Sequence, residues 1–418
     1  MKQISRQKFL LNIWTRYPEL PKQVLVYGVV QEIIQDNNKR ICLKIDGKLF
    51  DLLLSEQICP DLEFCETNDI VAIDNKGQMI LLAPCLGPAQ MSVDLDLQQK
   101  WNLFHRNLRN FFENQNFIEV QTPSLVSCPG SEPSLEVFET EFEWGSLKRK
   151  IFLPTSPELS IKKFLAHAVR QKPNLKVFEI AKVFRNNEIT ERHHPEFFML
   201  EWYRCFQDLD SIREDILNLL KALTGKSDFK VQQNTMKELF LEHVNFNLTP
   251  KTSAKELQML ATKLDIDTRD IQNFDDLFNL IFIEKIEFKW PKENLFFLQK
   301  YPPSQAALAR IDSEGWGERF EFYWQGFEIA NAFHELNDPV AQRLRMKQDL
   351  ELKKIYGKKQ IPTDEIFLKS LEYGLPPTSG VALGMERLFM ALHQIKNISD
   401  LKFPLFQKIT SSDKEATT

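Results

Sequence analysis

The chain has 418 residues, of which 43% are hydrophobic and 27% are charged, and its formal net charge is −5. This composition is typical of a globular protein with two or three domains and gives no general attraction to nucleic acid. No apolar run approaches the roughly 20 residues that span a bilayer, and the six cysteines form no Cys-x-x-Cys pair that would indicate a zinc site. We therefore expect a cytoplasmic protein with reduced thiols and no contact with a membrane.

Residues 1–88 are predicted to form a short helix, over residues 1–20, and then a small β-barrel. Five short runs rich in β-branched residues lie within residues 24–83, and turn signals such as Asp46-Gly47 separate them. Short strands at this spacing favour a barrel of the oligonucleotide-binding (OB) type. Gly87 and Pro88 mark the boundary to the next domain.

Residues 89–410 are predicted to form one large α+β domain, followed by a disordered tail over residues 411–418. Apolar residues at helical spacing predict helices over 94–116, 158–170, 207–224, 340–356 and 384–396. Strands are expected at 117–120, 150–154, 176–184, 197–204 and 319–330, and residues 225–300 form a mostly helical insertion. Strands clustered in this way favour a mainly antiparallel sheet flanked by helices.

The strand over residues 197–204 carries the strongest functional pattern. Phe197, Met199, Glu201 and Tyr203 alternate onto one face, which is an unusual composition for a core. One interpretation is an edge strand with a solvated glutamate. The other is the floor of a ligand site, in which the phenyl ring stacks on a flat ring while the glutamate and tyrosine bind an amine.

The loop before this strand is rich in groups that can bind phosphate. Arg185 emerges at the end of the strand over 176–184, where its guanidinium fork suits a phosphate. The run Glu191-Arg192-His193-His194 adds cations to the same loop. A polyphosphate at one end of the site and an amine at the other would be satisfied by ATP beside an amino acid.

Two carboxylates near residue 325 are candidate metal ligands. Two carboxylates with substrate phosphates are the usual way in which Mg²⁺ is held. Strict alternation along a strand places Glu321 and Glu328 on opposite faces, so they would converge only across a bend or bulge, which Gly326 could supply. The alternative is two ordinary surface glutamates.

Two further segments carry candidate ligands. Gly384 allows a close approach of the backbone to a ligand, and Arg387 falls in the first turn of a predicted helix, where a cation needs an anion nearby. Glu158 follows Pro157 at a predicted helix start. It is either an ordinary first-turn glutamate or a ligand of an amino group.

Taken together, these segments resemble the three signature motifs of class II aminoacyl-tRNA synthetases, in the lysyl branch. Pro123 resembles motif 1, residues 185–203 resemble motif 2, and Gly384 with Glu386 and Arg387 resembles motif 3. The resemblance covers residues 95–405. It implies the class II fold, an antiparallel sheet flanked by helices, and motif 1 implies a homodimer.

Residues 155–158, 323–336 and 375–384 narrow the resemblance to the elongation factor P lysine ligases, paralogues of lysyl-tRNA synthetase that attach lysine to a protein. Ser156 and Ala382 follow the paralogue, whose pocket accepts (R)-β-lysine. The resemblance implies formation of an aminoacyl-adenylate from ATP and transfer of the acyl group to elongation factor P. A compact lysyl-tRNA synthetase that charges tRNA is the first alternative, and a non-catalytic synthetase-like regulatory protein is the second.

The resemblance also implies a role for each site residue. Arg185 and Arg387 would be catalytic, with Arg185 on the α-phosphate, His193 and Arg387 on the outer phosphates, and Phe197 stacked on adenine. The full ATP site would comprise Arg185, Asn187, His193, His194, Phe197, Glu328, Gly384 and Arg387, and Mg²⁺ would be held by Glu321 and Glu328. Lysine or β-lysine would be bound by Ser156, Glu158, Glu201, Tyr203, Asn331, Phe333, Glu335 and Ala382.

The chain departs from the family pattern at three places. Asn187 stands where the family usually has Glu, and His194 stands where it usually has Asn. The paralogues generally lack an anticodon domain, whereas residues 24–83 here are predicted to form a small barrel. Residues 1–90 hold ten Lys and Arg against eleven Asp and Glu, so a barrel used for dimerisation or protein docking is favoured over one that reads an anticodon.

Overall fold

The computed structural model describes residues 24–34, 40–46, 48–53, 65–74, 79–83, 85, 94–269, 271–306 and 308–402. The predicted helix over residues 1–20, the boundary at residues 87 and 88 and the predicted tail from residue 411 lie outside the described residues. The chain divides into two compact units, Met1–Val93 and Asp94–Thr418.

The N-terminal unit is an antiparallel sheet of five strands. They are β1 (Val24–Ile34), β2 (Arg40–Ile45), β3 (Lys48–Leu53), β4 (Ile70–Asp74) and β5 (Met79–Ala83), in the order β3-β2-β1-β4-β5. Val30, Ile41, Leu43 and Val71 are fully buried in its core. The antiparallel strands agree with the predicted OB-like region.

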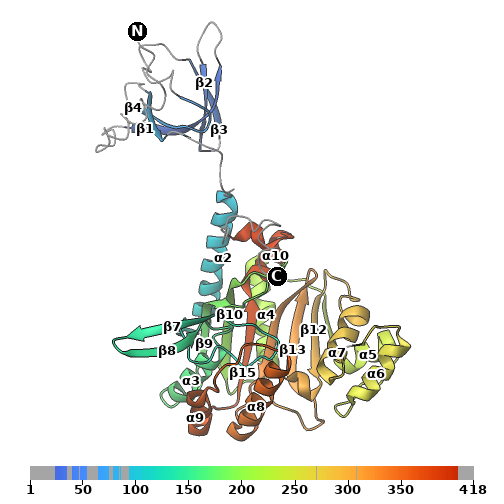
Figure 1. Ribbon diagram of the computed structural model, residues 1–418. Coiled ribbons are helices and arrows are strands. Elements are labelled where there is room, and N and C mark those ends of the chain that lie inside the picture. The colour runs from blue at the N-terminus through green and yellow to red at the C-terminus, as the bar shows by residue number, and fades with distance from the viewer. Residues whose placement is uncertain are drawn as a thin grey trace. The chain divides into compact units, whose positions relative to one another are not determined.

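The second unit is built on a sheet of eight strands in the order β11-β12-β13-β14-β15-β10-β9-β6 (Figure 1). Their bounds are β6 (Ile118–Glu119), β9 (Lys176–Phe184), β10 (Glu196–Cys205), β11 (Val231–Thr235), β12 (Leu295–Tyr301), β13 (Gly317–Trp324), β14 (Phe327–His334) and β15 (Thr378–Gly384). The five central pairings are antiparallel, and only the edge pairs β11–β12 and β6–β9 are parallel. The predicted fold class is therefore confirmed.

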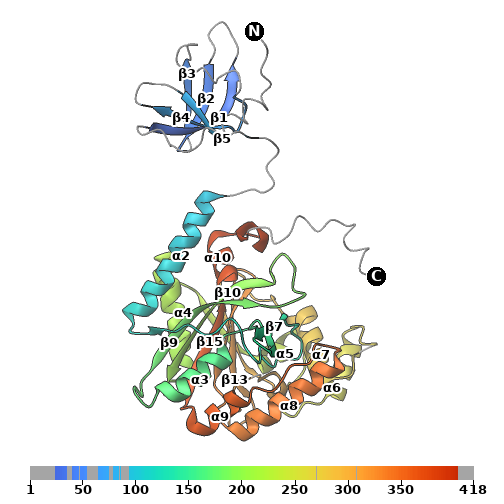
Figure 2. The ribbon, with the colours of Figure 1, turned by 60° about the vertical axis from the view of Figure 1, so that its left-hand side comes forward.

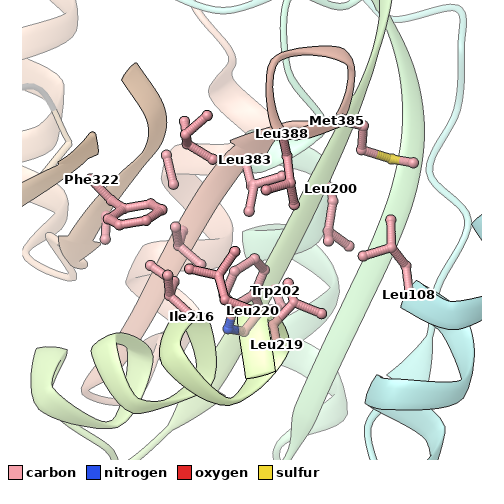
Figure 3. Packing of buried hydrophobic residues seen from close by; sticks show 14 of the residues in the cluster. Leu108, Leu200, Trp202, Ile216, Leu219, Leu220, Phe322, Leu383, Met385 and Leu388 are labelled. Carbon is pink, nitrogen blue, oxygen red and sulfur yellow. The ribbon is translucent and has the colours of Figure 1, made fainter. Parts of the chain in front are cut away.

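Three helices cover one face of this sheet, namely α2 (Leu95–Asn114), α4 (Leu209–Thr224) and α10 (Met385–His393). Figure 3 shows Leu200 and Trp202 of β10 against Ile216, Leu219 and Leu220 of α4. All five side chains are at most 1% exposed, and burying a side chain of this size contributes about 1.5–3 kcal/mol. The period of two along β10 thus commits Glu201 and Tyr203 to the opposite face.

The opposite face is covered at one end by α3 (Glu158–Ala168), α8 (Pro339–Ile355) and α9 (Glu365–Gly374), with α9 packed against both of the others (Figure 2). At the other end lies the predicted insertion, with α5 (Met236–Val244), α6 (Ala254–Lys263), α7 (Phe274–Ile281) and the π-helical turn η2 (Phe282–Ile286) packed on β12. The middle of this face stays open between the two groups of helices.

The predicted strand over residues 319–330 is in fact a hairpin of β13 and β14. Its turn residues Gln325 and Gly326 have φ values of 52° and 79°, which suits a two-residue hairpin turn between twisted strands. The turn was missed because aromatic residues flank it closely on both sides and a single glycine was its main signal in the sequence. A second hairpin, β7 (Glu139–Trp144) with β8 (Leu147–Phe152), projects from the body of the unit (Figure 1).

Capping residues fix the ends of several helices. Asp208 accepts a hydrogen bond from the backbone of Ser211 at the start of α4, and Gly225 ends it with a φ of 69°. Thr235 and Glu238 form a reciprocal capping box on α5. Within the described part of the chain, no helix has both the length and the apolar character needed to cross a membrane.

Candidate active site

The register of the sheet assembles the predicted residues into two rows on its open face. In one row Glu201 pairs with Ala382, Ala382 pairs with Asn331, and Asn331 pairs with Glu321. In the adjacent row Tyr203 pairs with Gly380, which pairs with Phe333 on its other side. Paired residues of neighbouring strands point to the same face, so segments far apart in the sequence form one floor.

A cavity of about 450 Å³ lies above this floor. The predicted residues that line it are Ser156, Glu158, Arg185, His193, His194, Phe197, Glu201, Glu328, Asn331, Phe333, Ala382, Gly384 and Arg387. Tyr203, Glu321 and Glu335 lie behind the lining and are buried. Asn187 lies outside the lining and is exposed.

Glu201 and Tyr203 form a buried polar pair at one end of the cavity. The Tyr203 hydroxyl donates to Oε2 of Glu201 over 2.6 Å. The other oxygen, Oε1, is buried and has no hydrogen-bond partner within the described residues. Burial and then the charge of Glu158 raise the pKa of Glu201 well above its usual value. An unpartnered buried carboxylate oxygen that faces a cavity is suited to accept from an ammonium group.

Lys162 completes this end of the cavity, and sequence reasoning missed it. Its ammonium lies 2.5 Å from Oε1 of Glu158 and also contacts Oε2 of Glu335. All three side chains are buried. Burial raises the pKa of Glu335 to about 8, although the charge of Lys162 opposes the shift. The signal in the sequence was the spacing of four between Glu158 and Lys162, which places both on one face of a helix.

Guanidinium groups line the other end of the cavity. Arg185 lies over the ring of Phe197, with 5.3 Å between the guanidinium carbon and the ring centroid. Its Nε is buried and has no hydrogen-bond partner in the part of the chain that the structure describes. Arg387 donates from Nη1 to the backbone oxygen of Glu328 over 3.0 Å. Arg192, which sequence reasoning did not assign, also lines the cavity.

The two histidines do not add positive charge, contrary to the interpretation from sequence. Burial and then the charge of Arg387 lower the pKa of His193 to about 4. Its Nε2 lies 2.6 Å from Nη2 of Arg387, which can only donate, so its Nδ1 carries the proton toward Thr190. Burial also lowers the pKa of His194, which bonds to the backbone oxygen of Glu196 over 2.7 Å. The cations at this end are therefore arginines.

The two candidate metal ligands share a face across the hairpin turn at Gln325 and Gly326, in agreement with the expectation that Gly326 would supply a bend. Tyr323 pairs with Glu328, and the register shift beside this pair makes Ile329 an extra residue on β14. Both oxygens of Glu321 are already engaged, by Arg319 and by the hydroxyl of Tyr323. Among the described residues no group of three or more His, Cys, Asp or Glu side chains is placed to hold a metal ion.

The loop after β9 turns Asn187 away from the site. Its φ of 62° is in the left-handed region, and its backbone nitrogen donates to Oδ1 of Asn186 over 2.9 Å. The next residue, Glu188, lines the cavity instead. Asn187 is therefore not in reach of the cavity in this conformation. It lies in the loop after β9 ends at Phe184, where the regular alternation of a strand no longer determines which way a side chain points.

We expect the affinity for lysine to rise with pH. Burial raises the pKa of Glu335 to about 8 and also raises the pKa of Glu201, so below pH 8 the empty pocket holds at least the proton of Glu335. An ammonium ligand favours their charged forms, so binding should release about one proton near pH 7. The association constant should rise up to about tenfold per pH unit between pH 6 and 8, then level off. Calorimetry in two buffers of different ionisation enthalpy measures this release, and norleucine, which lacks the side-chain amine, is the control. Equal proton release with lysine and with norleucine would contradict this prediction.

Comparisons with known proteins all match this chain to class II tRNA synthetases or to ligases similar to them. The model of the family "tRNA synthetases class II (D, K and N)" matches residues 90–407. The chain is 36% identical over 312 residues to the elongation factor P–(R)-β-lysine ligase of Proteus mirabilis, which covers 72% of this chain and 92% of that protein. It is 35% identical over 320 residues to the ligase of the same name from Haemophilus influenzae, covering 75% and 95%. With the lysine–tRNA ligase of Buchnera aphidicola it shares 34% identity over 333 residues, covering 74% and 64%.

Proposed function

The chain belongs to the family of class II tRNA synthetases (D, K and N), and on that premise we propose that it is an ATP-dependent ligase that attaches lysine or (R)-β-lysine to elongation factor P. The observation that carries this proposal is the polarity of the cavity. Buried carboxylates lie at one end, around Glu201, and guanidinium groups lie at the other, around Arg185 and Arg387. A diamino acid and a nucleotide triphosphate fit these two ends.

The proposed reaction has two steps, adenylation of the amino acid and transfer of its acyl group. A carboxylate oxygen of the amino acid attacks the α-phosphorus of ATP, a phosphorus–oxygen bond forms, and pyrophosphate leaves with the electron pair of the broken bond. An amine of the acceptor then attacks the acyl carbon, AMP leaves, and the amine loses a proton. Fixed guanidinium groups stabilise the charge that develops on the phosphate, and we assign this role to Arg185 and Arg387.

We call the end of the cavity around Glu158, Glu201 and Glu335 its amine end, and we place the lysine site there. We propose that Glu201, with Tyr203 holding its second oxygen, accepts one ammonium of the substrate, and that Glu158 and Glu335 face the other. Asn331 and Phe333 complete the floor beside them. Ser156 and Ala382 line the same cavity, which supports a role for both in selecting the lysine isomer.

The nucleotide would occupy the arginine end. We propose that Phe197 stacks on the adenine and that His193, as a neutral group, and Arg387 contact the outer phosphates. Gly384 has no side chain between the end of β15 and the cavity. His194 lines the same region, whereas Asn187 would reach the nucleotide only if its loop rearranged.

Bound Mg²⁺ would neutralise charge on the ATP phosphates, and Glu328 with Glu321 would hold it. The electrostatics of the site support a cation there. The pKa of Glu287 is raised to about 7 by burial and by the charges of Glu321 and Glu328, so three carboxylates repel one another at this place. Glu321 would exchange one of its present partners, Arg319 or Tyr323, for the metal.

A protein acceptor is favoured over tRNA by two observations. The alignment covers 92% and 95% of two relatives named as elongation factor P ligases but 64% of the lysine–tRNA ligase. In addition, the wall of the cavity opposite the sheet carries Glu132, Asp275, Asp276 and Asp349. Carboxylates on this wall attract a lysine side chain and repel an RNA backbone. We also propose that the protein is cytoplasmic. We further propose that it forms the homodimer that its motif 1 implies.

The test is acceptor transfer. Purified protein receives ATP, Mg²⁺ and labelled lysine or (R)-β-lysine, together with either elongation factor P or total tRNA. We expect ATP-dependent label on the factor and none on tRNA. Label on tRNA alone would identify a compact lysyl-tRNA synthetase. Absence of amino-acid-dependent ATP–pyrophosphate exchange with every amino acid would support the non-catalytic alternative.

A further inference from the structure

Lys162 is a fully buried cation behind the amine end of the cavity, in contact with the lining residue Glu158, and the proposed chemistry does not use it. It is 0% exposed, and it lies between two carboxylates assigned to the substrate, Glu158 and Glu335. These two residues come from different elements, the first turn of α3 and the segment directly after β14. The ammonium therefore ties α3 to the central sheet at the place where the substrate amine would bind.

The charges around Lys162 determine the state of this pocket. Three carboxyl groups gather here, those of Glu158, Glu201 and Glu335, and when all three are ionised the single ammonium of Lys162 reduces their net charge from −3 to −2. Burial alone would lower the pKa of Lys162, but the charges of Glu158 and Glu335 raise it overall. Lys162 is thus held as a cation, and its charge in turn opposes protonation of the two carboxylates.

Other ionisable groups also pack around the pocket, and the cation Arg319 among them is engaged by Glu321 and by Oδ1 of Asn331. Glu179 lies beside Glu201 on β9 and accepts hydrogen bonds from the backbone and hydroxyl of Thr122. Glu132, on the loop between β6 and β7, adds a further negative charge near Glu158. The hydroxyl of Tyr203 is neutral, because burial raises its pKa well above the usual value.

We propose that Lys162 is a positioning residue that determines specificity for a substrate with two ammonium groups, by holding Glu158 and Glu335 in line with each other and by opposing their protonation. This inference rests on the proposed function and deepens it. Once binding has released the proton of Glu335, the three carboxylates and Lys162 carry a net charge of −2, which matches the two ammonium groups of lysine or β-lysine after its carboxylate has joined the phosphate. Without Lys162, one or more carboxylates would take up a proton and lose the ability to accept from an ammonium donor.

The experiment compares Lys162→Met with Lys163→Met by lysine-dependent ATP–pyrophosphate exchange across pH 6–9. Lys163 is the matched control, because it is the next residue of α3 and pairs with the nearly buried Asp364 over 2.7 Å, away from the cavity lining. For Lys162→Met we expect the KM for lysine to rise on the order of 100-fold at pH 7, with the KM for ATP unchanged. The defect should shrink as pH rises, since the carboxylates of the variant deprotonate at higher pH. Lys163→Met should keep the wild-type KM and pH profile.

Two further variants keep the proposal testable if Lys162→Met does not fold. Lys162→Arg retains the cation and should recover part of the lysine affinity. The double variant Glu158→Gln/Lys162→Met restores a net charge of −2. The rise of its KM for lysine at low pH should therefore lie closer to that of the wild type. A defect in Lys162→Met that is independent of pH, or a wild-type KM in it, would overturn the role of Lys162. A wild-type protein without lysine-dependent exchange would instead overturn the proposed function.

Discussion

An Arg387→Ala variant is expected to lose lysine-dependent ATP–pyrophosphate exchange by about 10³-fold in kcat, with little change in the KM for lysine. The guanidinium is held by two fixed acceptors, the backbone of Glu328 and Nε2 of His193, so it is already oriented for phosphate. Removing one such preorganised donor from a site that stabilises developing charge costs on the order of 10²–10³ in rate. Lysine binding should survive, because the carboxylates that face the amine lie at the other end of the cavity.

The matched control for this variant is Arg343→Ala. Arg343 lies on α8, is exposed, and pairs with Glu365 over 2.8 Å, which is a surface contact of small consequence. We expect wild-type exchange activity from it. If Arg387→Ala kept more than about a tenth of the wild-type kcat, Arg387 would not belong to the catalytic machinery, and the resemblance to motif 3 would be structural alone.

A Gly380→Ala variant is expected to lose lysine binding and part of its stability. A Cβ at this position would overlap the ring of Tyr203 and lie 2.5 Å from Oε1 of Glu335. Both neighbours are buried, so neither can move aside without disturbing the amine pocket. Overpacking of this kind typically costs about 1–3 kcal/mol of stability. We expect an increase of at least about 100-fold in the KM for lysine, measured by exchange, while ATP binding without lysine persists.

Gly384→Ala is the control on the same strand. A Cβ there would meet only the side chain of Arg387, at 3.6 Å or more, and the φ of −74° suits any residue. Thermal stability and the KM for lysine should therefore match the wild type. If nucleotide passes close to this backbone, as we propose, the KM for ATP alone should rise. Equal effects of the two alanines on lysine binding would contradict the assignment of Gly380 to the amine pocket.

Alternation along single strands was informative because it depends on local geometry. The pattern of β10 separated Leu200 and Trp202 from Glu201 and Tyr203, and the structure places the first pair in the helical core and the second on the open face. Most of the helices and several strands were likewise predicted, but α9 and the strands β7, β11 and β12 were not, and β11 and β12 lie in the segment predicted to be mostly helical. The hairpin at Gln325 and Gly326 was missed, since positive φ values at both turn residues leave little trace in the sequence.

The sequence by itself determined the fold class, the faces of the strands and the set of polar residues that could serve an adenylating ligase. The fold class and the strand faces follow from periodicity, whereas the adenylating chemistry and the residue roles follow from the resemblance to the class II synthetase motifs. The tertiary structure alone decided which of those residues meet. The register of β10, β15 and β14 brought Glu201, Ala382 and Asn331 into one row. Burial made His193 neutral, and Lys162 became the partner of Glu158 and Glu335. Register, desolvation and ion pairing between distant segments arise only when the chain is packed, so no local pattern could reveal them.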